Sequence, residues 1–185
     1  LAADLSKVNW PDGTLRMQHE WIGRSEGAEI KFAVAGHEGS TISVFTTRPD
    51  TLMGVTYVVL APEHALVSVV TTEANKAEVD AYVKKTSARS DRDRMAQTKQ
   101  KTGVATGAFA VHPLTGQSVP IWVADYVIGT YGTGAVMAVP GHDTRDFEFA
   151  KAFSLPIVEV VSPDGSLKDS LSEASTDDGV AVRRG

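Results

Sequence analysis

The sequence predicts an α+β fold, in which a β-barrel-like sheet is accompanied by peripheral helices. Several short segments alternate polar and apolar residues, as half-buried strands do, and turn residues separate them. Residues 73–100, in contrast, contain no glycine or proline and are rich in Ala, Lys, Glu and Arg. Because helices are inserted between short strands, a closed or nearly closed barrel is expected.

The first strands are expected early in the chain. Residues 29–34 and 41–45 alternate polar and apolar side chains, and 36–40 form a turn between them, which predicts a hairpin. Residues 56–60 are more uniformly apolar and fit a buried strand. A helix is expected to begin at Pro62, because proline suits a first helical turn.

The second half of the chain shows the same texture. Residues 73–100 predict two helices or one broken helix, and strands are expected at 109–111 and 119–123. Two further apolar segments follow, at 126–128 and 135–139. A helix is then expected from about Asp143, with an apolar side formed by Phe147, Ala150 and Phe153.

The predicted domain organisation has three parts. Residues 1–20 look like a connector, with a turn at 10–13, and residues 21–162 form the core, with β-like texture from Trp21 onward. Residues 163–185 are rich in Ser, Asp and Gly and are expected to form a distal loop or strand segment.

Composition excludes several classes of protein. The chain has 185 residues, 42% of them hydrophobic, which suits one globular domain. Glycine, proline or charge interrupts every apolar run, so no membrane span is expected, and the first residues lack the order of a secretory signal. The absence of cysteine excludes disulfides and thiolate metal sites. The net charge of -5 argues against bulk electrostatic binding of nucleic acid.

Basic residues are nevertheless concentrated in residues 84–101, relieved only by Asp91 and Asp93. A solvated helix face of mixed charge is the simpler interpretation. A local contact to phosphates is the alternative.

The first segment with suggestive chemistry is Phe45 to Thr51. Threonines at a strand end and Arg-Pro-Asp in a turn are also ordinary structural features. Strand-end hydroxyls, however, can hold a water or a carbonyl oxygen. No histidine is adjacent to activate them as nucleophiles, so positioning is their more plausible work.

The second segment covers residues 131–147. Its glycines fit neither a dinucleotide fingerprint nor a phosphate-binding loop. Asp143 is expected as a helix N-cap and Asp146 as the third helical residue, where a negative charge is favourable. A metal site at His142, Asp143 and Asp146 is disfavoured, because the ligand count is short and consecutive residues rarely point at one ion.

Together these two segments resemble the threonine-rich motif and the second editing motif of leucyl-tRNA synthetase editing domains. Residues 21–27 resemble the junction through which such a domain leaves the synthetase body, and 110–116 match a further stretch. The isoleucyl and valyl relatives typically have Pro-Trp where this chain has Pro49-Asp50, so the leucyl family is favoured. No His-Ile-Gly-His or Lys-Met-Ser-Lys-Ser signature of a synthetic site is found, so the chain looks like a piece of a larger enzyme.

The resemblance implies roles for the matching residues. Thr46 and Thr47 would contact the ester and the terminal adenosine, and Asp146 would hold the aminoacyl ammonium as the third catalytic candidate. The implied specificity residues, which would exclude leucine, are Thr51, Met137 and Val139. The remaining implied substrate- or adenosine-binding residues are Arg48, Asp50, Ile128, Tyr131, His142, Asp143 and Arg145.

The resemblance implies hydrolytic proofreading of mischarged tRNA(Leu), such as its isoleucyl, methionyl or norvalyl esters, by one domain of a class I leucine–tRNA ligase. Editing would need no metal or cofactor, because ATP and magnesium belong to the parent's synthetic site. The implied partners are the tRNA(Leu) 3′ end and the rest of the synthetase, in a monomer in a bacterial cytoplasm or an organelle. A non-catalytic docking module for the tRNA 3′ end, an isoleucyl- or valyl-type editing domain and a metal-dependent hydrolase remain alternatives.

Overall fold

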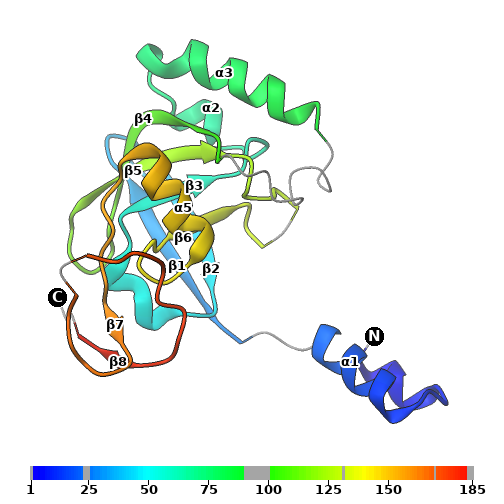
Figure 1. Cartoon of the computed structure of the whole chain (residues 1–185). Coiled ribbons are helices and arrows are strands. Elements are labelled where there is room, and N and C mark those ends of the chain that lie inside the picture. Colours follow the sequence, from blue (N-terminus) through cyan, green and yellow to red (C-terminus); the bar gives the residue numbers. More distant parts are fainter. Residues whose placement is uncertain (1, 23–25, 90–100, 131, 169, 183–185) are drawn as a thin grey trace.

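The computed structural model describes residues 2–22, 26–89, 101–130, 132–168 and 170–182. A curled sheet carries short helices on its outside (Figure 1). The helices are η1 (Ala2–Lys7), α1 (Asp12–Ile22), η2 (Pro49–Gly54), α2 (Val67–Val70), α3 (Glu73–Ser87) and α5 (Thr144–Phe153). The strands are β1 (Ala28–Val34), β2 (Thr41–Thr46), β3 (Tyr57–Leu60), β4 (Gly103–Val111), β5 (Ser118–Ala124), β6 (Ala135–Ala138), β7 (Val161–Ser162) and β8 (Val180–Ala181).

The main sheet has six strands in the order β2-β1-β4-β5-β3-β6. Its pairs are antiparallel except β3 and β5, which run parallel. The edge strands β2 and β6 come back into contact, although no hydrogen-bonded pairing joins them within the described residues. The predicted α+β, barrel-like fold with peripheral helices is therefore confirmed, whereas complete closure of the barrel is not found.

Both faces of the central strand β3 are buried, because successive side chains of a strand point to opposite sides. Val58 and Leu60 belong to the larger core cluster, which the curled sheet encloses with side chains such as Phe32. Tyr57 and Val59 belong to a second cluster, which lies between the sheet and α5. This second cluster fixes the position of α5, and α5 carries part of the site described below.

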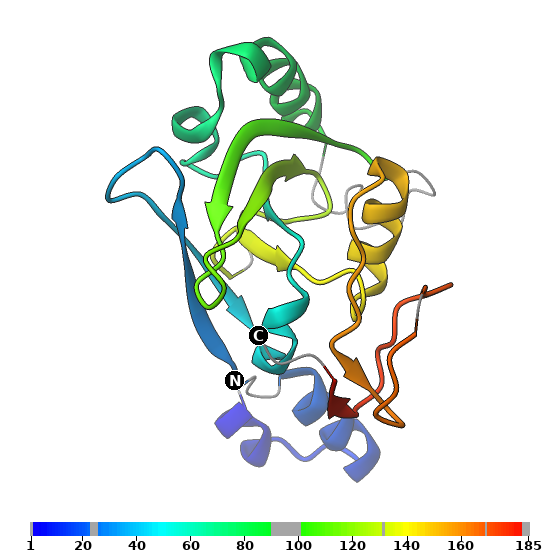
Figure 2. The same cartoon turned by 90° about the vertical axis from the view of Figure 1, so that its left-hand side faces the viewer.

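The helices α3 and α5 cover different parts of the sheet, as the two views show (Figures 1 and 2). The helix α3 contacts β4. At Gly107 the register of β4 and β5 shifts, which marks a β-bulge, and its φ of 79° is in the region that favours glycine. A Cβ at this position would lie 2.3 Å from the Thr72 hydroxyl oxygen, so glycine lets the loop before α3 approach the strand.

Most predicted strands are present, and the hairpin of β1 and β2 is confirmed with Ile30 opposite Val44. The strand β4 begins at Gly103, well before the predicted residue 109. Its first half was not predicted because Gly103, Ala105 and Gly107, which have little β preference, interrupt its β-branched residues. The apolar segment at 126–128 is a turn rather than a strand. Its Val127 is apolar because it packs in the cluster beneath α5.

Three further expectations about local structure were wrong. No helix begins at Pro62, because the His64 ring accepts the Leu66 N–H at 3.1 Å and so stabilises a turn instead. The turn expected at 10–13 is the start of α1, in which the Pro11 carbonyl accepts the Thr14 N–H at 2.9 Å. Trp21, where β texture was expected, lies in the same helix. Of the predicted 73–100 helical stretch, residues 90–100 lie outside the described residues.

The N-terminal helices η1 and α1 contact each other and lie apart from the sheet (Figure 1). The expected boundary between connector and core, at residues 20 and 21, falls within α1. At the other end, residues 163–168 and 170–182 are mostly irregular, and the chain returns to the body through the short pair β7 and β8. No helix in the described part of the chain is both long and apolar enough to cross a membrane.

We predict that Phe149→Ala lowers the free energy of unfolding by about 3–5 kcal/mol, as a deleted buried aromatic side chain does. Phe149 is fully buried, and its ring centroid lies 5.5 Å from that of Tyr57 and 4.4 Å from that of Phe153. Urea unfolding would measure the change. Phe109→Ala is the matched control, because Phe109 is 46% exposed, and it should cost less than about 1 kcal/mol. Equal losses in the two variants would contradict the assignment of the core.

Candidate functional site

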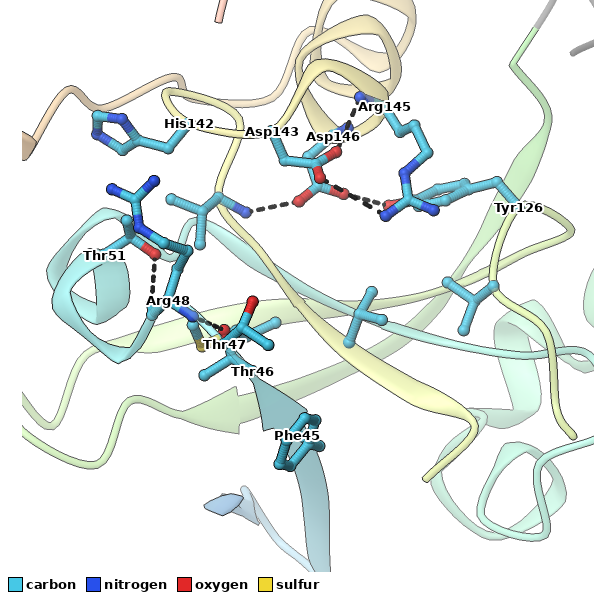
Figure 3. Close-up of a pocket in the computed structure, with 14 residues that line it drawn as sticks. Phe45, Thr46, Thr47, Arg48, Thr51, Tyr126, His142, Asp143, Arg145 and Asp146 are labelled. Carbon is cyan, nitrogen blue, oxygen red and sulfur yellow. Dashed lines mark hydrogen bonds and ion pairs between the residues drawn. The ribbon is translucent and has the colours of Figure 1, made fainter. Parts of the chain in front are cut away.

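A cavity of about 300 Å³ opens beside the end of β2, between η2, β6 and the start of α5 (Figure 3). The neighbours β2 and η2 are far in sequence from the neighbours β6 and α5, and the two pairs meet because β2 and β6, the two edges of the sheet, come into contact. The residues that line the cavity are Phe45, Thr46, Thr47, Arg48, Thr51, Tyr126, Val127, Val136, Met137, Val139, His142, Asp143, Arg145 and Asp146.

The structure brings the two predicted segments together. All three catalytic candidates and all three specificity candidates line the same cavity, as do four of the expected substrate-binding residues: Arg48, His142, Asp143 and Arg145. Asp50 and Ile128 are not part of the lining. Tyr131 lies outside the described residues.

The threonines differ in what their hydroxyl groups do. The Thr46 hydroxyl accepts the Arg48 N–H at 3.0 Å, and the Thr51 hydroxyl donates to the Arg48 carbonyl oxygen at 2.8 Å. No hydrogen bond of the Thr47 hydroxyl is found within the described part of the chain, and Figure 3 shows it directed into the cavity. Thr51 is only 2% exposed, so it presents a fixed β-branched wall, whereas Thr47 presents an available hydroxyl.

Arg48 and Asp50 form a bidentate ion pair at the rim of the cavity. Nε of Arg48 donates to Oδ1 of Asp50 at 3.1 Å, and an Nη atom donates to Oδ2 at 2.9 Å. The hydrogen bond to Arg48 lowers the pKa of the Asp50 carboxyl, and the same contact raises the pKa of the Arg48 guanidinium. Asp50 therefore acts on the cavity through Arg48 rather than by direct contact.

Asp146 is a carboxylate held in place on both oxygens. Oδ1 accepts the Tyr126 hydroxyl at 2.9 Å and Oδ2 accepts the Val139 N–H at 2.9 Å (Figure 3). Burial, followed by the negative charge of Asp143, raises the pKa of Asp146 from 3.8 to about 7. The hydrogen bonds from Val139 and Tyr126 and the charge of Arg145 act in the opposite direction, but they do not offset the burial. The site therefore contains a nearly buried acid whose ionised form a bound cation would stabilise.

Asp143 caps α5 as predicted. Its side chain accepts the N–H groups of Arg145 at 2.8 Å and of Asp146 at 3.1 Å. Asp146 is consequently the third residue of the helix, where the N-terminal end of the helix dipole favours a negative charge. The Arg145 guanidinium lies 3.6 Å from the Asp143 carboxylate, beside the mouth of the cavity.

His142 lines the cavity, and its ring is also hydrogen-bonded to the C-terminal part of the chain. Nε2 accepts the N–H groups of Val160 at 3.0 Å and Val161 at 3.2 Å, so Nδ1 carries the proton and donates to the Ser175 carbonyl oxygen at 2.9 Å. Both nitrogens are therefore used within the protein. His142 joins the cavity wall to the C-terminal segment and is not placed as a general base.

Gly141 allows two segments of the chain to pack closely at the cavity wall. A Cβ at Gly141 would lie 2.3 Å from the Val158 carbonyl oxygen. The chain at 158–161 therefore packs directly against the turn between β6 and α5, within reach of His142.

Four lining residues were not predicted to act at the site: Phe45, Tyr126, Val127 and Val136. Phe45 and Val136 are neighbours in sequence of predicted residues, which is the signal that pointed toward them. Tyr126 has no such signal, because it precedes the second segment and only the tertiary structure brings its hydroxyl to Asp146. Among the described residues, no group of three or more His, Cys, Asp or Glu side chains is placed to hold a metal ion.

The cavity thus combines the Asp146 carboxylate, which is suited to bind a cation, with the Thr47 hydroxyl and an apolar wall. The chain is similar to proteins that are already known. The family model described as "Leucyl-tRNA synthetase, editing domain" matches residues 19–185. A leucine–tRNA ligase of Sorangium cellulosum (strain So ce56) is 62% identical over 192 residues, which cover 100% of this chain and 22% of that protein.

A solved structure is also similar. It is the ternary complex of Agrobacterium radiobacter K84 agnB2 LeuRS with tRNA and LeuAMS, with a TM-score of 0.72 and 40% sequence identity. The match covers 93% of this chain and 20% of that one. The chain therefore spans about a fifth of the length of the relatives that it matches.

We predict that Asp146→Asn stabilises the protein at alkaline pH. The unfolded carboxyl loses its proton near pH 3.8 but the folded one only near 7, so the folded state binds more protons and loses stability as pH rises between these values. The neutral amide removes this loss, which is on the order of 4 kcal/mol when complete. Unfolding of the two proteins at pH 5 and pH 8.5 measures it. A gain from Asp146→Asn that is no larger at pH 8.5 than at pH 5 would contradict the raised pKa.

Proposed function

This chain belongs to the editing-domain family of leucyl-tRNA synthetases, and on that basis we propose that it hydrolyses the ester bond of tRNA(Leu) charged with the wrong amino acid. The observation that carries the proposal is the shared cavity of the threonine segment and Asp146. The expected substrates are the isoleucyl, methionyl and norvalyl esters.

Asp146 supplies the anchor for the aminoacyl ammonium. Each carboxylate oxygen accepts one protein hydrogen bond and retains a lone pair for a ligand. An ammonium at 4 Å attracts a carboxylate by about 4 kcal/mol at an effective dielectric constant of 20, before desolvation. Because the pKa of Asp146 is raised, part of the carboxyl is protonated near neutral pH. The ammonium of the substrate favours the ionised form and so promotes release of the carboxyl proton.

The apolar wall supplies discrimination against leucine. One methylene or branch is worth only about 1–3 kcal/mol in an apolar pocket, which explains why a second site is needed. Size alone cannot separate leucine from methionine and isoleucine, because these are not smaller than leucine. The shape of the side chain near the γ-branch must therefore determine which ester is excluded. Thr51, held by its bond to the Arg48 carbonyl, lines the cavity with Met137 and Val139 and is suited to this clash.

Hydrolysis then needs an aligned water and donors for the developing oxyanion, and each effect contributes several kcal/mol. The Thr47 hydroxyl is available for this work, and the Thr46 hydroxyl already accepts the Arg48 N–H and retains its own proton to donate. Because both nitrogens of His142 are engaged, no histidine of the cavity wall acts as the base. We therefore favour water-mediated hydrolysis assisted by the free ribose hydroxyl, without a covalent intermediate, metal or cofactor.

The remainder of a leucine–tRNA ligase chain is the second proposed partner, beside the 3′ end of the tRNA. We place the parent enzyme, as a monomer, in a bacterial cytoplasm or an organelle. A module that only docks the tRNA end would bind without deacylation, and a metal-dependent hydrolase would lose activity with a chelator.

Thr51→Ala should make the parent enzyme hydrolyse correctly charged leucyl-tRNA(Leu), because the β-branched wall is removed. The rate should rise at least tenfold, by roughly the worth of one apolar contact, and deacylation of radiolabelled leucyl-tRNA measures it. Thr41→Ala, at the exposed start of the preceding strand β2 and outside the cavity lining, is the control. Full resistance of leucyl-tRNA(Leu) in the Thr51 variant would remove Thr51 from the specificity role.

Asp146→Ala should abolish deacylation of isoleucyl-tRNA(Leu), by roughly a thousandfold, because about 4 kcal/mol of attraction to the ammonium is lost. Glu148→Ala is the control on the same helix, since Glu148 pairs with Lys101 and does not line the cavity. Normal editing by the Asp146 variant would end the anchor assignment. Binding of tRNA without deacylation by the unaltered enzyme would instead favour the docking module.

A further inference from the structure

The Tyr126 hydroxyl is the one side-chain donor that reaches the Asp146 carboxylate among the described residues. It donates to Oδ1 at 2.9 Å, while the backbone of Val139 holds Oδ2. Tyr126 also lines the cavity, so the bond lies beside the space where a ligand would meet the carboxylate. Figure 3 shows the Tyr126 ring reaching Asp146 from the side of the cavity away from the threonines.

The turn that carries Tyr126 is itself fixed to the fold. Arg89, after α3, donates to the Asp125 carboxylate at 2.8 Å, and the Asp125 N–H donates to the Tyr82 hydroxyl at 3.0 Å. The Tyr126 ring packs against Phe149 of α5 at 5.5 Å between centroids. Tyr126 therefore approaches Asp146 from a rigid position between α3 and α5.

We propose that Tyr126 is a positioning residue, which keeps the Asp146 carboxylate ionised and aimed at the substrate ammonium. The proposal rests on the proposed editing function and adds to it a residue outside both sequence motifs. Because a hydrogen bond to a carboxylate favours its charged form, Tyr126 opposes the burial that would otherwise protonate the anchor. It also removes the freedom of the carboxylate to rotate away from the cavity.

The pH dependence involves every polar group near the carboxylate. On α5 and its cap, Asp143 disfavours ionisation of Asp146 and Arg145 favours it. On β3, the Tyr57 hydroxyl donates to the backbone carbonyl of Asp146 at 2.9 Å, and the Tyr57 side chain also interacts with that of Tyr126. Burial, followed by the charge of Asp146, raises the pKa of the Tyr126 hydroxyl well above its ordinary value, so Tyr126 stays a donor across the accessible pH range. The other charged or titratable groups that line the cavity are Arg48 and His142.

The first test compares Tyr126→Phe with the unaltered parent enzyme in deacylation of isoleucyl-tRNA(Leu) between pH 5.5 and 8.5. Loss of the hydroxyl should lower kcat/KM at neutral pH roughly tenfold, as expected for one hydrogen bond to a charged group. The acid limb of the profile should move to higher pH, so that raising the pH restores part of the activity. Glu148→Gln is the control on the same helix α5, because Glu148 pairs with Lys101 and does not line the cavity.

A second readout separates positioning from general damage. A non-hydrolysable 3′-amide analogue of isoleucyl-adenosine is measured with a free ammonium and with that group acetylated. Tyr126→Phe should weaken the free-ammonium analogue roughly tenfold and leave the acetylated one unchanged. A merely structural defect would weaken both equally and would overturn the proposal.

A third protein covers the case in which Tyr126→Phe does not fold. Incorporation of 3-fluorotyrosine at position 126 retains the shape but makes the hydroxyl a stronger donor, and the acid limb should move to lower pH. If the unaltered enzyme deacylates and these substitutions leave both the profile and the analogue preference unchanged, the role of Tyr126 is refuted while the function stands. If the unaltered enzyme does not deacylate at all, the proposed function itself fails.

Discussion

The structure depends on one constraint, which is that the Asp146 carboxylate must remain nearly buried and yet ready to be charged. Its two oxygens are held by the Val139 N–H and the Tyr126 hydroxyl, each at 2.9 Å. Burial outweighs both bonds and raises its pKa to about 7, so the folded protein loses stability as pH rises from 3.8 to about 7. Such a cost is typical of sites that store binding energy for a ligand of opposite charge.

The surrounding fold makes this arrangement rigid. Tyr57 and Phe149 stack in the cluster beneath α5, and the Tyr57 hydroxyl also donates to the Asp146 carbonyl, so packing and hydrogen bonding position the same helical turn. On the other side, the His142 ring joins the turn after β6 to the chain at 160–161 and to Ser175. The long C-terminal segment thus supports the cavity wall, and His142 is withdrawn from proton transfer.

Local patterns predicted much of the fold, because alternation and capping act within a few residues. The hairpin of β1 and β2, the buried strand β3 and the Asp143 cap of α5 all follow from such patterns. The early part of β4 was missed, since Gly103, Ala105 and Gly107 have little β preference, and this part is held as a strand by β5. The helix predicted at Pro62 is absent, because the turn that the His64 ring stabilises outweighs the local preference for helix.

The sequence by itself determined the chemistry of the two segments and the family, because their residue types and order are legible without coordinates. Only the tertiary structure decided that Thr47 and Asp146 face one cavity, since this requires the two edges of the curled sheet to meet. It also decided the hydrogen-bond partners of His142 and Tyr126, because those partners lie far away in the sequence. Residue identity therefore specifies what a side chain is able to do, and three-dimensional contacts determine which of those abilities remains available.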